Sequence, residues 1–281
     1  MTKIAPLVPD SDPTPDSKRG RILAVTNQKG GVGKTTTAIN IATALANAGR
    51  SVLLVDVDPQ GNLTSGVGLK AQRAAAGTVY EAVTSDEESF ADFVLPTRVA
   101  NLFLMPADRN LTGAEIEMVA LPHRERRLQR VIEPLRARFD YIFIDCPPSL
   151  GLLTLNALVA ADAVVIPLHC EYFALEGLAD LVSTMRRVRG SLNPALDIAG
   201  VLLTMYDERT NLGQQVARDV RGFFKEKVFD TVIPRNVRLG EAPSHGIPGV
   251  LYDPRSRGAE AYVALANEML ARDSAQEEKT K

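Results

Sequence analysis

The residues best suited to chemistry lie in a glycine-rich loop near the start of the sequence. Residues 28–36 read QKGGVGKTT, directly after the apolar run 22–26 and before a helical pattern. The segment resembles the phosphate-binding loop G-x-x-x-x-G-K-[ST], whose glycines let backbone N–H groups approach phosphate oxygens. We expect Lys34 to contact the β- and γ-phosphates and the Thr35 hydroxyl to ligate Mg²⁺. The expected nucleotide-binding residues of this loop are Gly30, Gly31, Val32, Gly33, Lys34, Thr35 and Thr36.

Acidic residues follow two further apolar runs, where carboxylates could hold a metal ion. The run 52–55 leads into Asp56 and then Asp58, and the run 141–144 leads into Asp145. The carboxyl ends of strands face the ligand crevice of an open α/β sheet, and an aspartate there is typical of a Mg²⁺–nucleotide site. Each aspartate alone could instead cap a helix or close a turn. Three motifs in this order favour a nucleotide site.

The composition is that of a globular protein without a metal-binding cluster. The chain has 281 residues, 45% of them hydrophobic, with a formal net charge of −2, which suffices for one large domain. Both cysteines, Cys146 and Cys170, lie in apolar stretches, and the three histidines show no ligand spacing. Buried thiols in a reducing compartment are therefore favoured over a disulfide. Without a membrane-length apolar run or a signal-peptide core, a cytoplasmic location is expected.

Short β-rich runs alternate with helical patterns through the chain. This alternation predicts a single α/β P-loop domain, in which a mostly parallel, twisted sheet carries helices on both faces. We expect the domain to span 21–273, with disordered tails at 1–20, which is rich in proline, and at 274–281. The expected strands are 22–26, 52–55, 102–105, 141–144, 163–167, 198–203 and 231–233.

A second lysine in the loop helps to tell one family of phosphate-binding loops from others. Lys29 precedes Gly30, and the run KGGVGKTT resembles the deviant Walker A motif of the ParA/MinD family of ATPases. The resemblance covers roughly residues 21–270 and implies that Lys29 reaches across a dimer interface to the nucleotide of a partner subunit. It also implies that Asp58 orients the attacking water, that Asp56 supports the Mg²⁺ shell and that Asp145 is the Walker B carboxylate. Lys29, Lys34 and Asp58 are thus the expected catalytic residues.

The C-terminal half carries segments that resemble the chromosomal, Soj-like branch of ParA proteins. The runs 233–238, IPRNVR, and 241–246, EAPSHG, are very similar to that branch. Segments around the first run border the adenine in those relatives. The resemblance therefore implies a base site near Met205, Pro234 and Asn236.

Surface charge distinguishes the ParA and MinD branches. MinD-like members end in a basic amphipathic helix that binds membrane. Here the helical pattern 259–272 has Arg272 as its only basic residue and two acids, so membrane binding is not expected. From Arg186 to Arg238, ten Lys/Arg stand against six Asp/Glu, an excess that could bind DNA phosphates or form an ordinary solvated face. The expected DNA contacts, each of which could instead pair with a local acid, are Arg209, Arg218, Arg235 and Arg238.

Together these features predict a ParA-type ATPase for chromosome or plasmid segregation. The resemblance implies that ATP and Mg²⁺ join two subunits into a sandwich homodimer, which binds double-stranded DNA of the nucleoid without sequence preference. A ParB-type centromere-binding partner would stimulate hydrolysis to ADP and phosphate and so release the dimer. One alternative is a related ATPase that positions a protein cargo on the nucleoid. Another is a nitrogenase iron protein, which needs paired cluster cysteines that Cys146 and Cys170 do not resemble.

Overall fold

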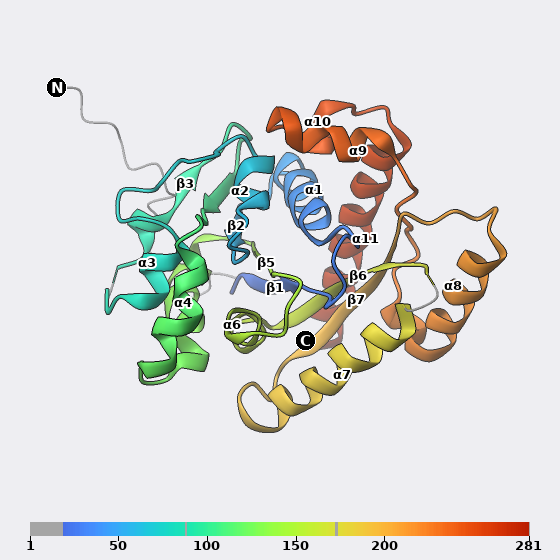
Figure 1. Ribbon diagram of the computed structural model, residues 1–281. Helices are drawn as coiled ribbons and strands as arrows, with labels where there is room; N and C mark the ends of the chain where they lie inside the picture. The colour runs from blue at the N-terminus through green and yellow to red at the C-terminus, as the bar shows by residue number, and fades with distance from the viewer. Residues whose placement is uncertain (1–18, 88, 172–173, 281) are drawn as a thin grey trace.

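Seven strands form one twisted sheet in the computed structural model, which describes residues 19–87, 89–171 and 174–280 (Figure 1). Their order is β3-β4-β2-β5-β1-β6-β7. Every neighbouring pair is parallel except β3 with β4. The strands are β1 Arg21–Val25, β2 Val52–Asp56, β3 Leu95–Pro96, β4 Leu102–Met105, β5 Tyr141–Asp145, β6 Ala163–His169 and β7 Asp197–Thr204.

Helices connect these strands along the described chain. None of the described helices is both long and apolar enough to cross a membrane. The α-helices are α1 Lys34–Asn47, α2 Asn62–Gly66, α3 Val79–Thr84, α4 Leu111–Glu117, α5 Arg127–Ile132, α6 Leu152–Ala160, α7 Ala174–Ser191, α8 Asn211–Phe224, α9 Val237–Glu241, α10 Gly249–Tyr252 and α11 Arg257–Thr280.

The sheet is buried on both faces because successive strand residues point to opposite sides. Ile22 and Ala24 of β1 belong to a buried cluster that includes residues of α6 and α7. Leu23 and Val25 belong to a second cluster that includes residues of α1 and α11. Figure 1 shows α1 and α11 on one side of the sheet and α6 and α7 on the other. The expected architecture, a mostly parallel sheet between two helical layers, is confirmed.

Six of the seven expected strands are present, with bounds within two residues of the expected ones. The seventh, 231–233, is wrong, because this segment makes only isolated contacts with β7. Ile233 N–H donates to the Leu203 carbonyl at 2.9 Å, and Tyr206 N–H donates to the Ile233 carbonyl at 3.0 Å. Pro234 comes next and has no N–H to continue a ladder. The two-residue edge strand β3 was not expected at all.

The C-terminal end of the described chain differs from the expectation. Helix α11 continues to Thr280, so residues 274–280 are helical rather than a disordered tail. The expected N-terminal tail falls largely on residues 1–18, which lie outside the described residues. Of its remainder, Arg19 forms an ion pair with Glu133, and Gly20 is buried against the Phe139 carbonyl.

Candidate nucleotide site

The sheet order brings the sequence motifs together at one edge. Strands β2, β5, β1, β6 and β7 are parallel neighbours, so their carboxyl ends lie side by side. Asp56 and Asp145 are register partners at the ends of β2 and β5. Asp145 is also the partner of Val25 on β1, which leads into the glycine-rich loop. Residues separated by more than a hundred positions therefore form one edge.

The loop between β1 and α1 has free space over its backbone. Gly31 and Gly33 have φ angles of 73° and 86°, a region that favours glycine. A Cβ added at Gly30, Gly31 or Gly33 would meet no atom within 4 Å. Helix α1 begins at Lys34 without a side-chain cap, which leaves its first N–H groups for an anion. Gln28 stands where the strict G-x-x-x-x-G-K-[ST] spacing has its first glycine, so the loop departs from that pattern.

Lys34 and Thr35 connect the start of α1 to the end of β5. Lys34 is only 7% exposed, and its Nζ donates to the Lys29 carbonyl at 3.1 Å. Burial lowers the pKa of Lys34, and the nearby Asp145 carboxylate opposes that shift. Thr35 Oγ1 donates to Asp145 Oδ2 at 2.7 Å.

Asp145 has an unsatisfied oxygen that fits a cation. Its Oδ1 is buried and has no hydrogen-bond partner among the described residues. Burial, reinforced by the charge of Asp56, raises the pKa of Asp145 well above its ordinary value. A divalent cation would stabilise the ionised carboxylate, and Mg²⁺ prefers oxygen ligands such as this carboxylate and the Thr35 hydroxyl. The donor set therefore fits the Mg²⁺ that sequence analysis expects at Thr35 and Asp145.

Asp56 is held by its own chain. Its carboxylate accepts hydrogen bonds from Thr64 N–H at 2.8 Å, from Thr64 Oγ1 at 2.6 Å and from Asp58 N–H at 3.2 Å. Burial nevertheless raises the pKa of Asp56 to about 6. Asp58 is also buried, and its Oδ1 accepts from Gln60 N–H at 2.9 Å. Sequence analysis missed Thr64, because a threonine inside a short helix carries no signal of this contact.

Lys29 lies at the same edge, and its own chain engages it. Its N–H donates to Asn27 Oδ1 at 3.0 Å, and Asn27 Nδ2 donates to the Pro167 carbonyl at 2.8 Å. The Lys29 ammonium forms an ion pair with Glu171, just beyond β6. Sequence analysis missed both partners. A polar residue between an apolar strand and a glycine loop, as Asn27 is, was the available signal. The reach of Lys29 to a partner subunit stays a prediction.

The end of β7 connects the loop to the expected base site. Thr204 Oγ1 donates to the Val32 carbonyl at 2.8 Å. Met205 follows with a φ of 48°, a value uncommon for a residue with a side chain and frequent at functional sites. Tyr206 then pairs with Pro234 through an isolated parallel bridge. The structure therefore places Met205 and Pro234 close together, in a segment attached to the loop.

Asn236, the third residue expected near the base, caps a helix. It is the N-cap of α9, and its Oδ1 accepts from Arg238 N–H at 2.9 Å. A cavity of about 800 Å³ adjoins this segment. Tyr206, Pro234 and Arg235 are among its lining residues, whereas Met205 and Asn236 are not. Contact of these residues with a base stays a prediction.

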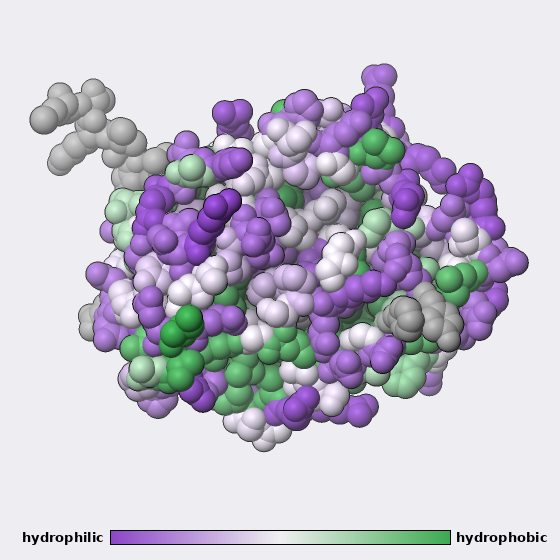
Figure 2. Space-filling model, in the orientation of Figure 1, coloured by the Kyte–Doolittle hydropathy of each residue, from purple (hydrophilic) through white to green (hydrophobic). Residues whose placement is uncertain are grey.

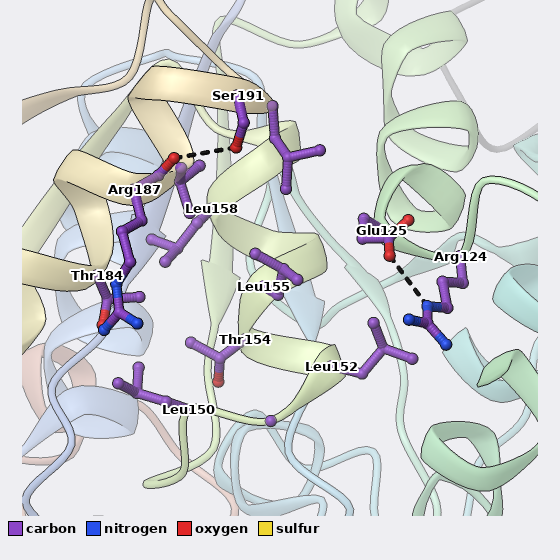
Figure 3. Close-up of a pocket in the computed structure, with 13 residues that line it drawn as sticks. Arg124, Glu125, Leu150, Leu152, Thr154, Leu155, Leu158, Thr184, Arg187 and Ser191 are labelled. Atoms are coloured by element: carbon purple, nitrogen blue, oxygen red, sulfur yellow. Dashed lines mark hydrogen bonds and ion pairs between the residues drawn. The ribbon is translucent and has the colours of Figure 1, made fainter.

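A second cavity, of about 500 Å³, lies away from the loop, between α6 and α7 (Figure 3). Leu152, Leu155 and Leu158 line it, with Arg124 and Arg187 at its sides. Hydrophobic residues gather on the same part of the surface, over α6 between α4 and α7 (Figure 2). None of the expected nucleotide-binding residues lines this cavity.

Two of the four expected DNA contacts are paired with acids. Arg209, whose side chain is 85% exposed, lies 2.7 Å from Asp207. Arg238, 54% exposed, lies 2.9 Å from Glu241 and 3.5 Å from Asp253. These two arginines therefore pair with local acids, as the alternative interpretation expects. Both side chains are exposed and so stay available to other anions.

The other two arginines form no ion pair within 4 Å in the described part of the chain. Arg218, on α8, and Arg235, before α9, are exposed and form no ion pair with a described residue. Arg235 lines the 800 Å³ cavity together with Arg209, whereas Arg218 and Arg238 do not. DNA binding by these residues stays a prediction.

The fold and the loop place the chain among P-loop nucleotide-binding proteins. A family model described as "AAA domain" matches residues 20–198. The chain is 55% identical to "Chromosome partitioning protein ParA" of Myxococcus xanthus over 255 residues, 91% of this chain and 89% of that protein. It is 57% identical to "Sporulation initiation inhibitor protein Soj" of Bacillus subtilis over 90% of this chain and 99% of that protein. The chain therefore belongs to the ParA/Soj family of chromosome-partitioning proteins.

Solved structures agree with this fold. A structure named cobyrinic acid a,c-diamide synthase from Mycobacterium smegmatis, with bound ADP and magnesium, matches with a TM-score of 0.79 and 38% identity. The match covers 92% of this chain and 96% of that one. The cell division ATPase MinD of Pyrococcus furiosus matches with a TM-score of 0.74 and 29% identity, over 90% and 99% of the two chains. The resemblance to the ParA/MinD family is thus confirmed.

Proposed function

We propose that this chain is a Mg²⁺-dependent ParA-type ATPase that segregates a chromosome or a plasmid. One observation carries the proposal. Three features lie together at the edge where β5 and β1 end. They are the open glycine loop, the buried Lys34 and the unsatisfied Asp145 oxygen. A buried ammonium beside free N–H groups suits the phosphates of ATP.

Each residue of the site would have its own role in binding or hydrolysis. Lys34 and the loop N–H groups would bind the β- and γ-phosphates, and Thr35 with Asp145 would hold Mg²⁺. The metal would neutralise charge on the phosphates. Asp56, which already accepts three hydrogen bonds, would support the shell rather than enter it. Asp58 would orient the attacking water.

ATP would join two copies face to face, with Lys29 of each reaching the nucleotide of the other. The homodimer would bind double-stranded DNA of the nucleoid through phosphate contacts. Its arginines, including Arg218 and Arg235, would be doubled in number relative to one subunit. A ParB-type partner would stimulate hydrolysis to ADP and phosphate and release the dimer from DNA.

A gel-shift series tests the proposal. Wild-type protein is titrated against two duplexes of unrelated sequence, with and without ATP and Mg²⁺, over a range of salt concentrations. We expect binding that requires ATP, is equal on both duplexes and weakens steeply with salt. Tight binding without nucleotide, or a strong preference for one duplex, would contradict the proposal. A purified ParB-type protein should raise the ATPase rate in a parallel assay.

A further inference from the structure

Lys29 makes three hydrogen-bond contacts within its own chain. Its N–H is bound by Asn27, and its carbonyl accepts from Lys34 Nζ. Its ammonium is paired with Glu171. The backbone contacts fix where the side chain starts, and Glu171 fixes where it ends. A lysine that must reach another molecule is thus already occupied within its own chain.

The two carboxylate oxygens of Glu171 have different partners. Its Oε2 accepts from Lys29 Nζ, and its Oε1 lies 2.6 Å from His169 Nδ1. The hydrogen bond from Lys29 is the main reason that the pKa of Glu171 lies below its ordinary value. Arg235 also acts on this carboxyl through its charge. The carboxylate is therefore ionised at neutral pH and oriented between two basic side chains.

We infer that Glu171 is a positioning residue that holds the Lys29 ammonium in cis and must release it before two subunits can join. This inference rests on the proposed function, in which Lys29 binds the partner's nucleotide. The Lys29 and Glu171 side chains are 35% and 44% exposed, so the ion pair can open without unfolding the chain. Phosphates that carry several negative charges would compete for the ammonium, whereas a nucleotide-free partner offers nothing in exchange.

The size of the effect follows from the exposure of the pair. Exposed ion pairs shift an equilibrium by up to about fivefold each. Two such pairs open when two subunits join, so Glu171 should weaken ATP-dependent dimerisation by up to about twenty-fivefold. The Lys29–Glu171 ion pair therefore disfavours dimerisation in general. The phosphates of the partner's nucleotide become necessary for dimerisation, because they compete with Glu171 for the ammonium.

The Glu171 side chain can be changed without disturbing the turn that carries it. Its backbone N–H donates to the His169 carbonyl at 2.8 Å, and its carbonyl accepts from Ala174 N–H at 3.0 Å. Neither contact uses the carboxylate. Glu171→Gln keeps the size of the side chain and removes its charge. Asp180→Asn is the matched control, since Asp180 is exposed on α7 and forms no ion pair with a described residue.

The experiment measures dimerisation by light scattering across a protein titration, with Mg²⁺ and a slowly hydrolysed ATP analogue. We expect Glu171→Gln to lower the dimer dissociation constant by up to about twenty-fivefold, with ATP affinity of the monomer unchanged. Asp180→Asn should match the wild type. High salt should reduce the difference, because it screens the pair. Equal or weaker dimerisation of Glu171→Gln would overturn the inference. That result is expected if the Glu171 carboxylate binds the partner subunit, or if it only stabilises its own turn.

Two further variants keep the outcomes distinct. Glu171→Ala replaces Glu171→Gln if the latter does not fold, and it should show the same gain. Adding Glu171→Gln to Lys29→Ala should change nothing, because the gain requires the ammonium. A wild type that stays monomeric with the analogue would refute the proposed function itself. A wild type that dimerises beside an unimproved Glu171→Gln would refute only the role of Glu171.

Discussion

Two regions of the molecule hold their charged residues in opposite ways. The first is the phosphate-side edge, formed by the glycine-rich loop and the ends of β2 and β5. The second is the arginine-bearing surface beyond β7, which carries Arg209, Arg218, Arg235 and Arg238. At the edge, Asp56, Asp145 and Lys34 are buried, and their contacts come from their own chain. On the surface, Arg209 and Arg238 are largely exposed and pair with nearby acids. Buried charges need fixed partners, whereas exposed charges are well solvated and screened.

This difference determines how much one residue can do. A buried group with defined partners loses its function when one atom is removed, because nothing nearby replaces it. An exposed arginine shares its task with others, and its contribution depends on salt and on a second molecule. Single substitutions should therefore have large effects at the edge and small, similar effects on the surface.

Asp58→Ala should give the largest effect. Asp58 is buried beside Asp56 and is the expected residue for orienting water. Its loss should slow ATP hydrolysis by about 100-fold or more, because misplacing the nucleophile costs that much. ATP binding and dimerisation should persist, since the loop is unchanged. Single-turnover kinetics measure the rate, and an unchanged rate would exclude Asp58 from the reaction.

Lys34→Ala should remove most of the ATP affinity. Its buried ammonium is the charged donor of the loop, and losing one charge-assisted contact to phosphate costs about 2–3 kcal/mol. Calorimetry with ATP and Mg²⁺ measures the loss. Lys70→Ala, at an exposed residue outside the loop sequence, is the control. Wild-type affinity in Lys34→Ala would show that the site is misassigned.

Thr204→Val should have an intermediate effect, because Thr204 lies where the phosphate-side edge meets the segment beyond β7. The substitution keeps the shape of the side chain and removes the hydrogen bond to the Val32 carbonyl. An unsatisfied buried acceptor costs about 1–3 kcal/mol, so both thermal stability and ATP affinity should fall. Thermal unfolding with and without ATP separates the two. A smaller nucleotide-induced rise in Tm is expected, and an identical rise would mean that the contact does not affect the loop.

Substitutions of the exposed arginines should have the smallest effects. Arg218 is exposed and has no ion pair with a described residue, whereas Arg238 is held by Glu241. Arg218→Glu should weaken DNA binding severalfold on any sequence and lower the salt slope by about one per arginine lost. Arg238→Glu should weaken it less. Gel shifts across a salt series measure both, and a large effect of either on ATP-dependent dimerisation would break the distinction between the two regions.

The phosphate-side edge could be predicted from sequence because its signals are local. A glycine loop after an apolar run, and aspartates at the ends of two others, specify the strands and the chemistry together. Parallel pairing then requires Asp56 and Asp145 to be neighbours, as the structure shows. The fold was predictable for the same reason, except where pairing is short or interrupted, as in β3 and at Pro234.

The remaining contacts could not be predicted because they join distant segments through single side chains. Thr204 reaches Val32, Asn27 reaches Pro167 and Glu171 reaches Lys29, and no periodicity marks such pairs. The extent of α11 was missed because polar, charged residues at a chain end resemble a disordered tail. The same residues are also good helix formers, and the structure continues the helix through them.

We propose that Lys29 acts on the nucleotide of a second subunit. Lys29→Ala and wild-type protein are compared by light scattering and calorimetry, with Mg²⁺ and a slowly hydrolysed ATP analogue. We predict that both bind the analogue with similar affinity and that only the wild type becomes a dimer. A normal nucleotide-dependent dimer of Lys29→Ala would contradict the account.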